Sequence, residues 1–408
     1  MKISDKVKQY CLVMAVTGIA VIIYMVCYGQ GRNPLISIDA NKSMDYFVRV
    51  LTANHGVIEV NILEACEYNL QSLVMFVLGT VFQNFWTGIN VYYIGSFFMI
   101  SAAMYWFLQK LEISLPIATG IAVLTAFLPF HVDRGEGQLI TANFFLAPLL
   151  LGMLYDLIYQ KQTENGYRKG YLLLVCIAPF VDVRISIMTI LLFGVLILHR
   201  QDWYAAKHLL GYFLPLVILS IIEGALVSSL YVYQVEDSLQ MAQGEGLRLL
   251  DMLMPMRYHV IDRLSDLRLK YDIDFSVSGE NGLNTMGFLF TIGFLWKVCS
   301  LFYGQKGDKR IAWLGWIDIL VIVIANVQGL NLLLEYIGCH VIYWNRMGIF
   351  ILVGAAATLA IMAERLKEWT QAHGGKAVIT LGYVILLAAG IIGFLELLLR
   401  QESQMFLA

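Results

Sequence analysis

Four ionisable residues lie within six positions of the stretch FLPFHVDRGEGQLITANFF: His131, Asp133, Arg134 and Glu136. Imidazole and carboxylate groups can transfer protons, and a guanidinium group suits phosphate or carboxylate ligands. Charged groups beside long apolar runs are costly unless they are used or paired. We therefore predict a tight polar turn in which His131 and Glu136 are catalytic and Arg134 binds an anion. The alternative is a salt-bridged turn between two helix ends.

Two acids, Asp39 and Asp45, lie in the segment LISIDANKSMDYF, shortly after the first apolar run. A carboxylate at this place could remove a proton from an acceptor hydroxyl group. Asp39 is the candidate general base, and Asp45 could support it or contact the substrate. Aspartate is also a favoured N-cap, so Asp39 could instead cap a helix that begins at Ala40.

Further cations that could bind an anionic substrate lie in three other polar segments: Arg184, Arg257, His259, Arg263 and Arg346. Arginine forms bidentate contacts with phosphate and carboxylate groups. Each segment also has a structural alternative. Arg184 could form a simple ion pair with Asp182, the stretch around residues 257–268 could be an amphipathic helix at the membrane surface, and Arg346 could snorkel from a helix end.

The elements that must position these residues are expected to be membrane helices. Hydrophobic residues make up 59% of the 408 residues, charged residues make up 14%, and the mean hydropathy is +0.69. A soluble domain carries roughly 25% charged residues, so this chain would expose large apolar areas in water. The net charge of −2 gives no reason to expect a nucleic-acid partner. The sequence also lacks a phosphate-binding glycine loop, an HExxH motif and a paired CxxC motif.

We predict an all-α polytopic membrane protein with about eleven transmembrane helices, since a span needs roughly 20 apolar residues. Residues 1–408 would form a single transmembrane domain without a separate soluble domain. Two of the spans are short and meet at Asp182–Arg184. The predicted spans are 11–29, 88–109, 115–130, 139–159, 170–181, 185–199, 208–230, 284–303, 311–328, 347–363 and 377–399.

Basic residues in short loops set the orientation of a membrane protein. They place the N-terminus inside and the C-terminus outside, in a plasma (inner) membrane crossed many times. The inner segments then hold mostly lysines, Lys297 among them, and the outer segments mostly arginines. The two longest loops, 30–87 and 231–283, lie outside, and residues 70–86 are apolar enough to form an interfacial or re-entrant helix.

The six cysteines show no metal-binding spacing, and no metal site is predicted from them. Cys66 and Cys339 fall in polar segments on the predicted outer side, where a disulfide between them is one alternative. Asp39, Asp45 and Glu136 could supply oxygen ligands to a divalent cation. Their separation in the sequence does not show that they are close in space, so a metal requirement stays open.

Five stretches resemble, in order, those of bacterial GT-C-type membrane glycosyltransferase-like proteins, a group that includes the membrane portion of phosphoglycerol-transferase-like proteins. FLPFHVDRGEGQLITANFFLAPL resembles the family's "LPYHxxRGxGHLxLxxYxxxPL" stretch. ISIDANKSMDYF resembles its "GDA" loop, and LRLLDMLMPMRYHVIDRLSDLRLKY its "LLLPxxxHRIxxL" segment. ENGLNTMGFLFTIGFL and YWNRMGIFI resemble its "ENxxxxLGxxGxxGFL" and "YNRISIFI" segments. The resemblance covers about residues 39–400.

The resemblance implies the GT-C fold and transfer of a sugar from a polyprenyl-phosphate-linked donor on the outer face of the membrane, in cell-envelope glycan assembly. The acceptor would be a glycan, a lipid or a protein. Asp39 matches the family's carboxylate base, and Arg346 matches the arginine of the late motif. Three features depart from the pattern: Gln138 replaces a histidine, FVDVRISIM replaces an "SGxYY"-like stretch, and NILEACEYNL replaces a "GAPxGxN"-like segment.

Two other functions fit the same residues. The chain could bind or translocate a lipid-linked saccharide without catalysis, or it could anchor a separate phosphoglycerol transferase in the membrane. Catalysis should depend on Asp39, whereas lipid binding alone should depend on the outer arginines.

Overall fold

A computed structural model describes residues 3–27, 70–159, 169–199, 203–228, 244–256, 259, 261–275, 280–302, 308–336, 343–373, 384 and 388–396. Among these residues every regular element is a helix, apart from one isolated bridge between Leu247 and Asn326. The labelled helices are α1 (Ile3–Cys27), α4 (Leu70–Val81), α5 (Phe85–Lys110), α6 (Leu115–Ala126), α7 (Pro129–Ala142), α8 (Leu146–Tyr159), α9 (Lys169–Val181), α10 (Val183–His199), α11 (Trp203–Ser228), α13 (Leu249–Leu253), α14 (Asp262–Asp274), η1 (Asn281–Leu283), α15 (Phe288–Phe302), α16 (Lys309–Ala325), α17 (Asn331–Tyr336), η3 (Trp344–Met347) and α18 (Gly348–His373).

Five helical stretches of the described chain are long and apolar enough to cross a membrane: Asp5–Val26, Trp86–Lys110, Leu115–Gly135, Gln138–Tyr159 and Trp344–Ala372. Large apolar side chains also point away from the bundle. Ile22, Leu173 and Ile221 are 60–64% exposed on three different helices. Such a surface suits lipid rather than water. The prediction of an all-helical membrane protein is confirmed at this level.

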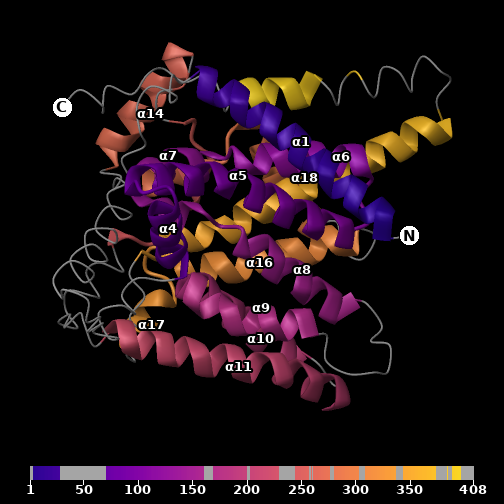
Figure 1. Cartoon of the computed structure of the whole chain (residues 1–408). Coiled ribbons are helices and arrows are strands. Elements are labelled where there is room, and N and C mark those ends of the chain that lie inside the picture. Colours follow the sequence, from indigo (N-terminus) through magenta and orange to yellow (C-terminus); the bar gives the residue numbers. More distant parts are fainter. Residues whose placement is uncertain are drawn as a thin grey trace.

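Helix α18 lies at the centre of the bundle, where it packs against α5, α6, α8, α15 and α16. The apolar part of α18 is 83% buried, whereas that of α1 is 28% buried. Glycine permits the close approach of α15 to α18, because a Cβ atom at Gly293 would lie 2.4 Å from the Ala355 carbonyl oxygen. Helices α9, α10 and α11 pack together along one side of the bundle (Figure 1).

The apolar segment 70–86 forms α4 and the turn that leads into α5. The Asn84 side chain caps α5 by accepting a hydrogen bond from the Thr87 backbone N–H at 3.2 Å. The two helices touch where both carry glycine, since a Cβ atom at Gly88 would lie 2.4 Å from the Gly79 nitrogen. Helix α4 therefore forms a tight helical hairpin with α5, and its role as an interfacial or re-entrant helix stays a prediction.

The stretch 131–138 was predicted as a tight polar turn between two spans. The structure instead keeps the chain helical as far as a kink at Gln138, and this kink separates the spans Leu115–Gly135 and Gln138–Tyr159. Pro129 stands in the first turn of α7, where its fixed backbone angle favours a helix and its missing N–H costs nothing. The helix reaches a kink at Gln138, where φ is −140° and ψ is 59°, and a second helical segment continues to Ala142. Across this kink Arg134 and Arg346 both bond the Gln138 amide, and Arg346 also bonds the Thr141 hydroxyl, so all three α7 residues reach one cluster.

A polar cluster lies near the C-terminal end of α18, around Glu364, far from Arg346, which directly precedes this helix. Glu364 accepts hydrogen bonds from the Ser114 backbone N–H at 2.9 Å and from Lys367 Nζ at 2.6 Å. Arg310 donates to the Leu111 carbonyl oxygen at 2.6 Å. Arg346 and Glu364 are 18 positions apart on one helical run, roughly 27 Å at 1.5 Å per residue. That length is close to the ~30 Å hydrocarbon core of a bilayer.

Lys297, predicted as a charge on the inner side, is instead fully buried between helices. Its Nζ atom lies 2.7 Å from the Asp318 carboxylate and 3.5 Å from the Ile351 carbonyl oxygen. A Cβ atom at Gly354 would lie 2.6 Å from the same Nζ atom, so this glycine makes room for the ammonium group. The Lys297–Asp318 ion pair joins α15 to α16, and the contact of Lys297 with Ile351 adds α18.

Replacing Lys297 with Met should destabilise the protein by about 3–5 kcal/mol, because Asp318 would be left as an unpaired buried charge. The double variant Lys297→Met, Asp318→Leu should recover most of this loss. The free energy of unfolding in detergent measures both effects. A double variant as unstable as the single one would show that the charge pair is not the cause.

Candidate functional site

Three arginines from separate parts of the sequence converge at the Arg346 end of α18. Arg134 comes from α7, Arg184 from the start of α10, and Arg346 from η3, directly before α18. Arg134 is fully buried and Arg346 is 9% exposed. Two groups join them, the Glu280 carboxylate and the Thr141 hydroxyl.

The Glu280 carboxylate holds two of these arginines. Arg346 donates to it twice, from Nη2 at 2.7 Å and from Nε at 3.0 Å. Arg134 Nη1 donates to the same group at 2.9 Å, and Gln138 Nε2 donates at 2.5 Å. Both oxygens of Glu280 are therefore surrounded by N–H donors, as in charge-assisted bidentate pairs.

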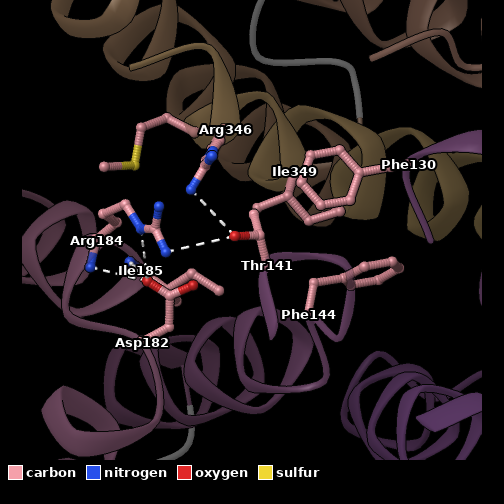
Figure 2. A pocket seen from close by; sticks show the side chains of 9 residues that line it. Phe130, Thr141, Phe144, Asp182, Arg184, Ile185, Arg346 and Ile349 are labelled. Atoms are coloured by element: carbon pink, nitrogen blue, oxygen red, sulfur yellow. Dashed lines mark hydrogen bonds and ion pairs between the residues drawn. The ribbon is translucent and has the colours of Figure 1, made fainter. Parts of the chain in front are cut away.

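The Thr141 hydroxyl oxygen lies between the other two arginines. It accepts from Arg346 Nη1 at 3.0 Å and from Arg184 Nη2 at 3.4 Å (Figure 2). Asp182 holds Arg184 from the other side, with 3.3 Å between Nε and Oδ1. The same Asp182 oxygen accepts from the backbone N–H groups of Arg184 and Ile185, so Asp182 also caps α10.

A small cavity opens beside these groups and has one polar and one apolar wall. Its polar wall consists of Thr141, Asp182, Arg184 and Arg346. Its free volume is about 10 Å³, which is the room of a single water molecule. A cationic wall facing an apolar wall suits an anionic group attached to a hydrocarbon. The apolar wall consists of Phe130, Phe144 and Ile349, which lie on the other side of Thr141 from Arg184 (Figure 2), and Ile185 and Met347 complete the lining.

A buried hydrogen-bond network around the Gln71 amide holds the backbone next to the site. Gln71 Nε2 donates to the carbonyl oxygens of Ile140 at 3.0 Å and of Val181 at 3.1 Å. Tyr92 donates to Gln71 Oε1 at 2.5 Å and accepts from Asn143 at 2.7 Å. Ile140 and Val181 directly precede Thr141 and Asp182, so Gln71 ties together the two segments that carry these site residues.

The sequence did not single out Glu280, Thr141 and Gln71 for any role. Glu280 and Thr141 lie inside stretches that resemble family motifs, although neither was given a function. Gln138 was noted only as a replacement for histidine. Its amide bonds Glu280 and accepts from Arg134 and Arg346, at 3.1 and 3.2 Å.

His131 lies in an aromatic part of the core and does not line the cavity. Its Nδ1 atom is 2.6 Å from the Ala126 carbonyl oxygen, and Nε2 is 2.7 Å from Ser96 Oγ. The ring packs against Tyr93 and Phe97, and the imidazole is fully buried. Such an imidazole cannot touch a substrate in this conformation, so the geometry gives no support to a catalytic role.

Two of the other predicted site residues, His259 and Arg263, lie in the described part of the chain. His259 is buried, its imidazole lies 3.8 Å from the Glu396 carboxylate, and burial lowers the pKa of His259. Arg263 is exposed on α14. Within α14 it is Arg268 that is buried, donating to Asp272 at 2.8 Å.

Asp39, Asp45, Arg257 and the Glu136 side chain lie outside the described residues, as do Cys66 and Cys339.

Among the described side chains, no group of three or more His, Cys, Asp or Glu residues is arranged to hold a metal ion. No protein-family model and no curated protein matches this sequence. The fold and the site together define a helical membrane protein with a buried arginine cluster at one end of its central helix.

Replacing Gln71 with Leu should destabilise the protein by about 1–3 kcal/mol, because the Ile140 and Val181 carbonyl oxygens would lose a buried donor. Thermal unfolding in detergent measures the change. Thr80→Val on the same helix is the control, since its hydroxyl bonds only an exposed carbonyl oxygen. Equal effects of the two substitutions would contradict the assigned role of Gln71.

Proposed function

We propose that this protein is a membrane glycosyltransferase of the GT-C type, which uses a polyprenyl-phosphate-linked sugar as donor. The observation that carries the proposal is the cavity where Arg184 and Arg346 meet across Thr141, opposite an apolar wall. The phosphate of the donor would bind the two guanidinium groups, and the first part of the lipid chain would follow Phe130, Phe144 and Ile349.

The proposed chemistry uses the arginines in the transition state. The acceptor hydroxyl oxygen forms a bond to the anomeric carbon of the sugar while the bond from that carbon to the phosphate oxygen breaks. The bonding electron pair leaves with the phosphate, where Arg184 and Arg346 stabilise the developing negative charge. Asp39 would receive the proton of the hydroxyl group as general base.

We also propose about eleven spans with the N-terminus inside a plasma membrane, and the contacts at the two ends of α18 agree with the predicted grouping of the cations on two sides. Arg134, Arg184 and Arg346 were each predicted on the outer side, and they meet in one cluster. Arg310 and Lys367, both predicted on the inner side, meet partners at the other end, at Leu111 and Glu364. The acceptor would then be a glycan, lipid or protein at the outer face.

One observation favours a second candidate, a non-catalytic protein that binds or translocates a lipid-linked saccharide. Among the described residues that line the cavity, the one carboxylate is Asp182, and it is already paired with Arg184 and caps α10. A binding protein needs the arginines and the apolar wall, but it does not need a general base.

A transfer assay separates the two functions. Membranes that contain the protein receive a labelled polyprenyl-phosphate-sugar mixture, and label in a new product is measured. Asp39→Asn should reduce transfer by about 10²–10⁴-fold, the usual contribution of a general base. Arg184→Gln should also reduce it, because the guanidinium group lines the cavity. Arg365→Gln is the matched control and should leave transfer unchanged, because Arg365 is exposed at the opposite end of α18.

Each outcome decides between the candidates. Equal transfer by wild type and Asp39→Asn would remove Asp39 from the mechanism. Bound lipid without transfer by any variant would favour the non-catalytic function. Equal losses in Arg184→Gln and Arg365→Gln would contradict the assignment of the cavity as the phosphate site.

A further inference from the structure

Glu280 occupies the position that an anionic ligand would take among the arginines. Its carboxylate receives four hydrogen bonds, two from Arg346, one from Arg134 and one from Gln138. Phosphate oxygens accept the same N–H donors in the same bidentate manner. We propose that Glu280 is an internal competitor, which fills the arginine cluster until an anionic group displaces its carboxylate.

The arginines have other partners, so they would stay in place when Glu280 moves. Arg134 also donates to Asn284 Oδ1 at 3.0 Å, and its guanidinium group stacks on Phe130 at 4.6 Å. Arg346 also donates to Thr141, and its guanidinium group lies 4.3 Å from the Tyr343 ring. Both cations are therefore held by the helical bundle independently of the Glu280 carboxylate.

Glu280 is more accessible to solvent than either of its two arginine partners. Its side chain is 13% exposed, compared with 9% for Arg346 and 0% for Arg134. It also lies outside the central helices, directly before the short helix η1. A change of its side-chain rotamer would break the carboxylate contacts of both arginines, while Arg134 would keep its 3.2 Å hydrogen bond to the Glu280 carbonyl oxygen.

The cavity supplies the route for displacement. An anion that enters it meets Arg184 and Arg346 first, because both line the polar wall. Arg346 is shared between the cavity and Glu280, so an anion bound there competes directly with the carboxylate. Glu280 thereby keeps weakly binding anions out and selects a ligand that gains further binding energy, such as contacts of a lipid chain with the apolar wall.

This inference rests on the proposed anion site, and binding of inorganic phosphate to the purified full chain tests it. Glu280→Gln keeps the shape of the side chain but removes its charge, so the affinity for phosphate should rise at least tenfold. Without phosphate the variant should unfold at a lower temperature than wild type, and phosphate should restore part of the loss. A merely structural Glu280 would give the loss without any gain in affinity.

Glu364→Gln is the matched control, because Glu364 is a similarly bonded carboxylate at the opposite end of α18. It should lower the unfolding temperature without changing phosphate affinity. Glu280→Asp provides a milder change if the glutamine variant fails to fold. The shorter side chain keeps the charge but reaches the arginines less well, so phosphate affinity should rise severalfold. An affinity that is unchanged or lower in the folded Glu280 variants would overturn the inference.

A long-chain polyprenyl phosphate, tested on the same samples, separates this inference from the proposed function. Tighter phosphate binding in Glu280→Gln, with no preference for the lipid over inorganic phosphate, would support the competitor and contradict the lipid-linked donor. A preference for the lipid in wild type, with no gain in Glu280→Gln, would support the donor and contradict the competitor.

Discussion

Three guanidinium groups at one end of the bundle must be paired, and this requirement organises the site. Taking an ion out of water costs several kcal/mol unless close partners compensate for the lost hydration. Glu280 compensates for Arg134 and Arg346, while Asp182 and Thr141 hold Arg184. These partners come from segments far apart in the sequence, so the arginines lock the ends of α7, α10 and α18 together.

The same requirement explains features of the backbone around the site. The non-helical geometry at Gln138 lies between Arg134 and Thr141, where the chain must direct an amide and a hydroxyl to the same cluster. Asp182 is the residue between α9 and α10, where one carboxylate both caps a helix and holds a cation. At the other end of the bundle, Glu364 and Arg310 likewise anchor the connection between α5 and α6.

Much of the helical framework was predictable from the sequence, because long apolar runs and lysine-rich segments are local signals. Residue type also indicated Arg134, Arg184 and Arg346, since arginines beside apolar runs are costly unless they have a use. Their common partner was not predictable. Glu280 lies 146 positions from Arg134 and 66 from Arg346, and no local pattern links an acid to cations at that separation.

Two errors have clear physical causes. Gly135 and Gly137 suggested a turn, but the helix that starts at Pro129 continues through both glycines and breaks only at the kink at Gln138. Lys297 was counted with the inner lysines although it lies inside the predicted span 284–303. Its partner Asp318 on the next helix lets the charge stay inside the bundle, and the space beside Gly354 makes this possible.

The most direct test of the account is photo-crosslinking with a polyprenyl phosphate that carries a photoreactive group close to the phosphate, followed by mapping of the labelled peptides. The account predicts labels on Phe130, Phe144 or Ile349, and their loss when excess unmodified polyprenyl phosphate is added. Labels confined to lipid-facing side chains of α1 and α11, and unaffected by the competitor, would contradict the assignment of the arginine cluster as the binding site for a lipid-linked phosphate.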